Sequence, residues 1–140
     1  MKRIVRSAIV EHSAAQMYAL VDDIERYPSF LPWCRDARVE EVDGRRRATL
    51  TVGLRGLRQS FTTLNENRPG EAIDLQLVEG PFRRFSAAWR FRSLGERACA
   101  IEFALQYEFS SRALGRLLEP LFDHIADTMV DAFTKRADAR

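Results

Sequence analysis

The chain has 140 residues, a formal net charge of +2, 46% hydrophobic residues and 30% charged residues. This length suits one domain spanning residues 1–140, and the composition is typical of a water-soluble globular protein. No apolar run approaches the ~20 residues of a membrane-spanning helix. The first seven residues already mix charged and apolar types, which excludes a signal-peptide core and predicts a cytoplasmic location. The two cysteines, Cys34 and Cys99, are far apart and lack a CxxC spacing, so neither a disulfide nor a metal site is expected.

The first two predicted elements are a strand and a short helix. Residues 3–10 alternate between apolar and polar types, as in a strand with one buried face. Ser13 can cap the helix that follows, because apolar residues recur at helical spacing from Ala14 to about Asp22.

Residues 27–34 read Tyr-Pro-Ser-Phe-Leu-Pro-Trp-Cys, which places four large apolar side chains beside two prolines. The prolines exclude a helix interior or a central strand, so we expect a stiff surface loop, preceded by a helical turn near 23–26. Large apolar side chains on such a loop either close the core as a fixed plug or form a gate to an apolar interior. The candidate gate residues are Tyr27, Phe30, Leu31, Pro32 and Trp33.

Between residues 38 and 109 the hydrophobic period changes to two. The clearest case is the segment 99–109, in which Ile101, Phe103 and Leu105 alternate with small or polar residues. Alternation of this kind predicts an antiparallel sheet with one buried face and one wet face. Turn residues at 43–44, 67–70, 80–81 and 95 mark breaks between strands, and the spacing of the alternating segments is typical of a meander of about six strands.

Helical spacing returns in residues 113–133, with Ser110 or Ser111 as the cap and Pro120 as a point of bending. No other predicted element is long enough to cover the buried face of the sheet. The sequence therefore predicts an α+β fold of order β-α-β6-α, in which a curved antiparallel sheet of about seven strands wraps around a long C-terminal helix.

The inward face of this sheet is rich in aromatic residues. They either fill the space under the helix completely or line a tunnel, because periodicity reports which way a side chain faces and not how tightly it packs. The predicted tunnel residues are Leu50, Val52, Phe61, Leu75, Leu77, Phe85, Trp89, Phe91, Phe103, Leu105, Tyr107, Leu118, Phe122, Ile125 and Met129.

Several segments together resemble the START-like, helix-grip superfamily, and within it the family of coenzyme Q-binding proteins and of the ribosome association toxin RatA. They are residues 20–34 with the tyrosine–proline loop, residues 79–82, residues 89–91 and the alternating strand 101–109. The resemblance implies a seven-stranded sheet around the last helix with an apolar tunnel between them. It also implies two functions, which are coenzyme Q binding in support of respiration and binding to the large ribosomal subunit that blocks subunit association.

These observations favour non-enzymatic binding of a hydrophobic small molecule, such as ubiquinone or a similar isoprenoid lipid. The inward aromatic residues suit an apolar tail, and Gln59, Thr63 and Asn65 could face a quinone carbonyl. The aromatic gate loop could also contact a membrane surface transiently. No cofactor is expected.

The alternative hypothesis is a RatA-type interaction with the large ribosomal subunit. Residues 45–97 hold eleven arginines and five acidic residues, and outward-facing arginines could contact phosphates. Acidic residues at 74, 102 and 108 share that face, so an ordinary lattice of surface ion pairs is an equally open interpretation. The candidate RNA-facing residues are Arg47, Arg55, Arg58, Arg84, Arg90 and Arg92.

Catalysis has little support in the sequence. His12 and His124 are far apart, and neither has a nucleophile or metal ligands at a recognisable spacing. The inward faces offer few ionisable groups for acid–base chemistry, so no catalytic residues and no metal ligands are predicted.

Overall fold

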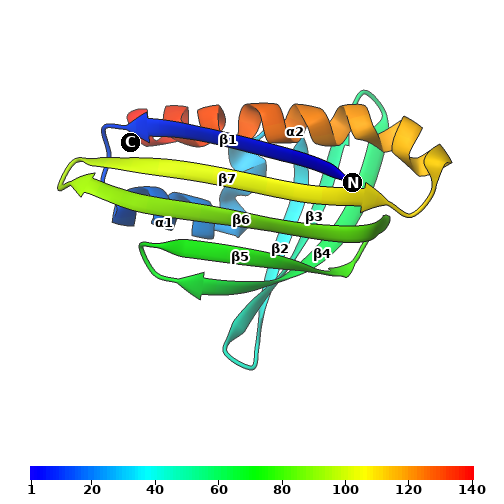
Figure 1. Cartoon of the computed structure of the whole chain (residues 1–140), viewed down its shortest axis with the longest axis horizontal. Helices are drawn as coiled ribbons and strands as arrows, with labels where there is room; N and C mark the ends of the chain where they lie inside the picture. Colours follow the sequence, from blue (N-terminus) through cyan, green and yellow to red (C-terminus); the bar gives the residue numbers. More distant parts are fainter.

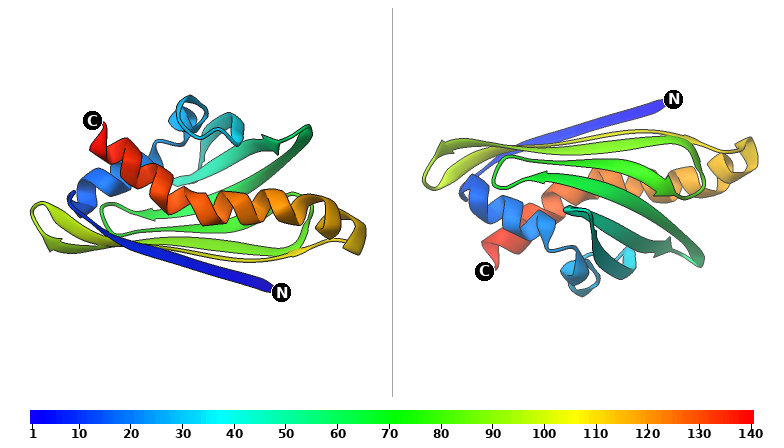
Figure 2. Two further views of the ribbon diagram at one scale, coloured as in Figure 1. Left: turned by 90° about the horizontal axis from the view of Figure 1, so that it is seen from above. Right: turned by 90° about the horizontal axis from the view of Figure 1, so that it is seen from below.

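The computed structural model describes all residues, 1–140, and shows a curved seven-stranded antiparallel sheet with a long helix along its concave side (Figures 1 and 2). The predicted fold class and element order are confirmed. None of the helices is long and apolar enough to cross a membrane. The elements are β1 (Lys2–Val10), α1 (Ala14–Asp22), the 3₁₀-helix η1 (Ile24–Ser29), β2 (Cys34–Val42), β3 (Arg45–Leu54), β4 (Leu57–Arg68), β5 (Ala72–Glu79), β6 (Phe82–Gly95), β7 (Ala98–Phe109) and α2 (Arg112–Asp138).

The strands lie in the order β1-β7-β6-β5-β4-β3-β2. Strands β2 to β7 form a meander of hairpins, and β1 returns to pair with β7, with Ile4 opposite Leu105 and Ala8 opposite Ile101. The two edges of the sheet are therefore β1 and β2, and α2 runs between them (Figure 2).

Both predicted helix caps are present. The Ser13 Oγ accepts a hydrogen bond from the Gln16 amide at 3.0 Å, and the Ser111 Oγ accepts one from the Leu114 amide at 3.2 Å. Helix α2 continues through Pro120 and ends at Asp138, five residues beyond the predicted end. The predicted end is too early because the next buried position, Ala137, is a small residue that adds little to an apolar stripe.

The turn between β3 and β4 is not apparent in the sequence pattern. Arg55 and Gly56 form this hairpin, and both have positive φ angles, 52° and 84°, as a two-residue turn of the primed kind requires. Arg55, which was predicted to face outward from the sheet, therefore lies in this turn instead. The sequence does not indicate this turn, because arginine is an unusual first residue for such a turn and the regular alternation of residues 50–54 suggests that the strand continues.

The proline segment does not run over the surface as a loop. Its first half is η1, and Tyr27, Leu31 and Trp33 are only 5%, 1% and 1% exposed. The prolines Pro28 and Pro32 face solvent, while the large side chains point inward. The Gly53 amide donates to the Trp33 carbonyl at 2.8 Å and ties the segment to β3.

Candidate functional site

The concave side of the sheet and α2 enclose a cavity of about 60 Å³. Of its 16 lining residues, 14 are apolar, so its chemistry suits a hydrocarbon or an aromatic ring. The lining consists of Ile24, Tyr27, Ala48, Leu50, Phe61, Thr63, Asn65, Leu75, Phe85, Ala87, Trp89, Phe103, Leu105, Phe122, Ile125 and Met129.

Two polar side chains from β4 interrupt this apolar lining. Thr63 and Asn65 face inward because they share the parity of Phe61, and both are buried. The Thr63 hydroxyl donates to the Asn65 Oδ1 at 2.7 Å, and this bond orients the amide. The Asn65 amide nitrogen has no protein acceptor, so it can donate a hydrogen bond to a carbonyl oxygen inside the cavity. Gln59, the third predicted polar residue, does not line the cavity, and its amide donates to the Ser60 carbonyl at 3.0 Å.

The cavity is smaller than a usual small-molecule site, which measures about 300–1,000 Å³. A ring-sized ligand therefore requires lining side chains to move. Leu50, Leu75 and Phe85 are the least confined of them, because each is only partly buried.

The cavity occupies only the middle of the predicted tunnel. Ten of the fifteen predicted residues line it, and the other five, Val52, Leu77, Phe91, Tyr107 and Leu118, do not. Aromatic packing fills the space beyond it: Phe91 meets Tyr18 edge-on at 5.7 Å, and Tyr107 packs against Phe82 at 6.0 Å. The inward direction of these residues is as expected, but packing excludes them from the cavity.

Three lining residues could not be recognised from the sequence as site residues. Ala48 and Ala87 have the correct inward parity, but their small side chains do not suggest a site. They matter because a small residue on the concave face leaves the space that a larger one would fill. Ile24 comes from η1, whose helical spacing is too short to stand out.

Of the gate residues, only Tyr27 lines the cavity. Its hydroxyl donates a hydrogen bond to the Val21 carbonyl, and burial raises its pKa well above the ordinary value. Tyr27 is the only ionisable group of the lining, so the cavity holds no pair of groups for acid–base catalysis at neutral pH.

The other four gate residues lie outside the lining. Leu31 and Trp33 are part of the core, Pro32 is exposed, and Phe30 is half-buried with its ring edge-on to Phe133 at 5.5 Å. In this conformation the segment is a packed plug, which is one of the two interpretations that the sequence leaves open.

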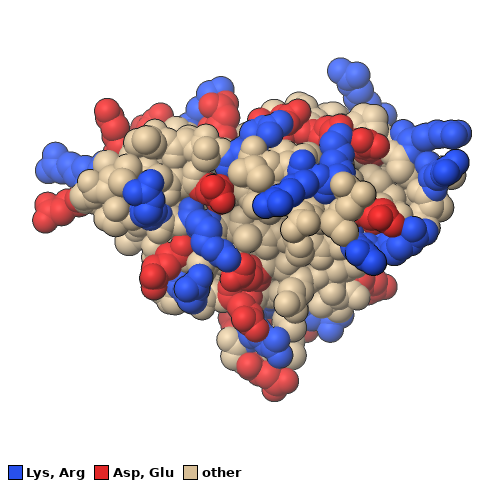
Figure 3. Space-filling model, in the orientation of Figure 1, with Lys and Arg blue, Asp and Glu red and all other residues tan.

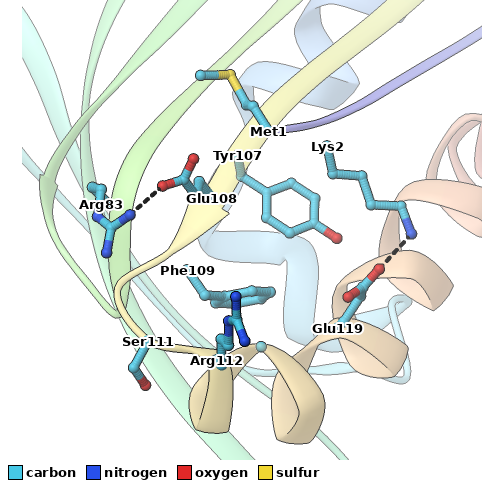
Figure 4. Close-up of a pocket in the computed structure, with 10 residues that line it drawn as sticks. Met1, Lys2, Arg83, Tyr107, Glu108, Phe109, Ser111, Arg112 and Glu119 are labelled. Atoms are coloured by element: carbon cyan, nitrogen blue, oxygen red, sulfur yellow. Dashed lines mark hydrogen bonds and ion pairs between the residues drawn. The ribbon is translucent and has the colours of Figure 1, made fainter.

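A second hollow, an open groove of about 370 Å³, lies where the first turns of α2 meet β1 and β7 (Figure 4). Its walls carry two ion pairs, Arg83 with Glu108 at 2.7 Å and Lys2 with Glu119 at 2.8 Å. The Tyr107 hydroxyl donates to Asp123 at 3.2 Å. Because these charges pair with each other, the groove offers no concentrated field of one sign.

The six predicted RNA-facing arginines do not form one continuous patch. Arg84, Arg90 and Arg92 lie on the outer face of β6, whereas Arg55 lies in the β3–β4 turn. Arg90 is held by Asp74 at 2.8 Å, and the other five have no carboxylate within ion-pair distance. Figure 3 shows basic and acidic side chains interspersed on the face of β1, β7 and β6.

Arg46 lies in β3 and points inward, because it shares the parity of Ala48. It pairs with Asp22 at 2.5 Å and also donates to the Asp22 carbonyl, which fastens the end of α1 to the sheet. No group of three His, Cys, Asp or Glu side chains is arranged to hold a metal ion.

The chain matches known proteins over nearly its whole length. Residues 10–134 match the model of the family described as polyketide cyclase/dehydrase and lipid transport. The chain is 44% identical over 135 residues to the ribosome association toxin RatA of Pseudomonas aeruginosa. The aligned residues cover 96% of this chain and 94% of that protein. It is 30% identical over 136 residues to the mitochondrial coenzyme Q-binding protein COQ10 homolog B of Xenopus laevis, covering 94% of this chain and 56% of that protein.

Solved structures share the fold. The Caulobacter crescentus protein CC1736 is 32% identical with a TM-score of 0.78, covering 99% of this chain and 97% of that one. The ZhuI aromatase/cyclase of a Streptomyces species has a TM-score of 0.86, covering 99% of this chain and 94% of that one; at 17% identity it shows the fold alone. The chain therefore belongs to the START-like polyketide cyclase/dehydrase and lipid transport family, alongside relatives named for RatA and for coenzyme Q binding.

Proposed function

We propose that the protein binds a hydrophobic small molecule, an isoprenoid quinone or a similar lipid, between the sheet and α2. The observation that carries this proposal is the cavity itself, which is apolar at 14 of 16 lining residues and has one buried, oriented amide donor at Asn65. A quinone ring has carbonyl oxygens for such a donor and an apolar tail for the rest of the lining. The relative named as coenzyme Q-binding supports this ligand class.

Binding requires the cavity to expand from its present volume of about 60 Å³. The energy for this change comes from burying ligand surface, at about 25 cal/mol for each Å² of apolar area. Leu50, Leu75 and Phe85 are the lining side chains that we expect to move, because they are only partly buried.

The test uses two neighbouring alanines of β6. Ala87 lines the cavity, whereas Ala88 faces the outer side of the sheet. Ala87→Leu fills the cavity, so we expect the affinity for ubiquinone, followed by tryptophan fluorescence, to fall at least about tenfold. Ala88→Leu adds the same atoms on the wet face, and the affinity should change less than about twofold.

The two variants distinguish a ligand inside the cavity from one bound elsewhere on the protein. Equal affinities for the two variants would place the ligand outside the cavity. Failure of wild-type protein to bind any quinone, with native mass spectrometry finding no lipid in protein from its host, would overturn the proposal.

A second candidate is association with the large ribosomal subunit. One observation favours it: relatives from several bacteria that are 40–44% identical over 96–98% of this chain carry the name RatA. The unpaired Arg84 and Arg92 of β6 are the first residues to test. Reversing both to Glu should abolish co-sedimentation with large subunits, whereas Arg116→Glu on α2 should not. Unchanged sedimentation of the double variant would remove this face from consideration.

A further inference from the structure

At the C-terminal end of α2, one arginine is held in place without an anionic partner. The Arg136 guanidinium carbon lies 5.0 Å from the centre of the Phe30 ring, within the range of a cation–π contact. No carboxylate lies within ion-pair distance of Arg136, and its buried Nε has no hydrogen-bond partner. A planar guanidinium that stacks on an aromatic ring through one of its faces keeps the N–H groups of its edges free to donate hydrogen bonds to a planar or tetrahedral anion.

Arg136 borders a small hollow of about 100 Å³. The other walls come from Leu20, Asp23, Arg26, Phe30 and Arg140. Three arginines and one aspartate therefore border the hollow, and Asp23 is only loosely paired with Arg26 at 3.7 Å. The volume of about 100 Å³ leaves room for a small polar group, and the excess positive charge of the walls favours an anion.

The helix dipole accounts for only part of this arrangement. Basic residues are favoured in the last turn of any helix, and Lys135 in the same turn fits that preference because it pairs with Asp131 at 3.0 Å. The dipole does not account for the stacking of Arg136 on an aromatic ring, or for Arg26, which comes from η1. Two separate elements place their arginines at one hollow.

The surroundings indicate which kind of anion fits. Pro28 and Pro32 are exposed and Phe30 is half-buried, so an apolar edge adjoins the three arginines. A cationic cluster beside apolar and aromatic side chains is the combination that anionic membrane surfaces attract. RNA recognition would use a free aromatic face for base stacking, but Arg136 already covers Phe30.

We propose that Arg26, Arg136 and Arg140, arranged around Phe30, bind the headgroup phosphate of an anionic phospholipid and dock this end of the molecule on a membrane surface. The site is connected to the cavity, because Phe30 contacts Tyr27 and Tyr27 lines the cavity. This inference goes beyond the proposed function, since the headgroup can bind whether or not the cavity takes a quinone.

The test is flotation of the full-length protein with vesicles at physiological salt. Wild-type protein should bind vesicles of equimolar phosphatidylcholine and phosphatidylglycerol and not vesicles of pure phosphatidylcholine. Arg136→Gln should weaken binding about fivefold, the effect of one cation close to an anionic surface. Arg112→Gln, the same charge change at the opposite end of α2 (Figure 1), should weaken it less than about twofold.

Two further arms separate a built site from general charge. Arg136→Lys keeps the charge but loses the planar guanidinium stacked on Phe30, so it should still weaken vesicle binding, though by less than the glutamine variant. Wild-type binding by the lysine variant would overturn the site. Inorganic phosphate should shift the NMR signal of the Arg136 Nε–H. A shift without vesicle binding, or an Arg136-dependent affinity for single-stranded RNA in its place, would overturn the lipid assignment.

Discussion

At the scale of single residues, the side on which a strand residue lies decides what it contributes. Trp89 is 2% exposed, lines the cavity and packs against Phe103 at 4.8 Å. Its neighbour Arg90 lies on the opposite face and pairs with Asp74 in solvent.

Substitution of these two neighbours should therefore have very different effects. Trp89→Ala should lower the free energy of unfolding by about 3–5 kcal/mol, because it removes a large buried ring. Arg90→Ala should cost less than about 1 kcal/mol, as for most exposed ion pairs. Urea denaturation measures both, and ubiquinone binding should likewise suffer more from Trp89→Ala. Equal losses would contradict the assignment of faces.

The same distinction limits what could be predicted about the site. Alternation along the strands is sufficient to place Phe61, Phe85 and Trp89 on the concave face. It could not place the cavity, because the space depends on the small size of Ala48 and Ala87 relative to residues on other strands and on α2.

At the scale of elements, charged contacts fasten α2 along the edge strand β1. Lys2 lies 2.8 Å from both Glu119 and Asp123, Arg6 pairs with Asp127 at 2.5 Å, and His12 contacts Asp138 at 2.6 Å. The acidic positions 119, 123 and 127 recur every four residues and therefore lie on one side of α2. These contacts hold α2 against β1 and place charged side chains along this edge strand, which disfavours its pairing with another chain.

Removing the first of these contacts gives an element-scale prediction. Lys2→Met should lower the free energy of unfolding by about 0.5–1 kcal/mol at low salt, since the pair is more than one-third exposed and screened by solvent. The loss should shrink in ~1 M salt, where the Debye length is about 3 Å. Arg3→Met, on the outer face of β1, provides the matched control and should be nearly neutral. A loss that is independent of salt would show that the side chain acts through packing.

At the scale of the whole molecule, the buried titratable groups make stability depend on alkaline pH. Burial raises the pKa of Cys34 to about 11, and it also raises the pKa values of Cys99, Tyr18, Tyr27 and Tyr107. Hydrogen bonds that Lys2 donates to Asp123 and Glu119 raise the pKa of its ammonium group. In each case the folded protein holds its proton more tightly than the unfolded chain does.

The sign of the effect follows from this difference in proton binding. Below pH ~8.5, the ordinary pKa of a thiol, these groups are protonated in both the folded and the unfolded chain, so they should not make the free energy of unfolding depend on pH. As the pH rises from there to about 11, the unfolded chain loses its protons first, and the free energy of unfolding should fall. Urea denaturation at a series of pH values measures this fall. Cys34→Ala removes one of the contributing groups, so its stability should decline less over the same interval. Stability that stays constant to pH 11 would contradict the prediction.

The sequence by itself determined the α+β class, the strand order along the chain, both serine caps and the inward face of most strands. These features depend on local periodicity and on the residues at the ends of elements, and both signals lie within a single short segment of the chain. Only the tertiary structure decided that the proline segment packs as a plug, that Arg46 pairs inward with Asp22 and that the cavity measures about 60 Å³. The physical reason is that close packing sums contacts between elements far apart in sequence, and a hydrophobic pattern states which way each side chain faces but not what fills the space in front of it.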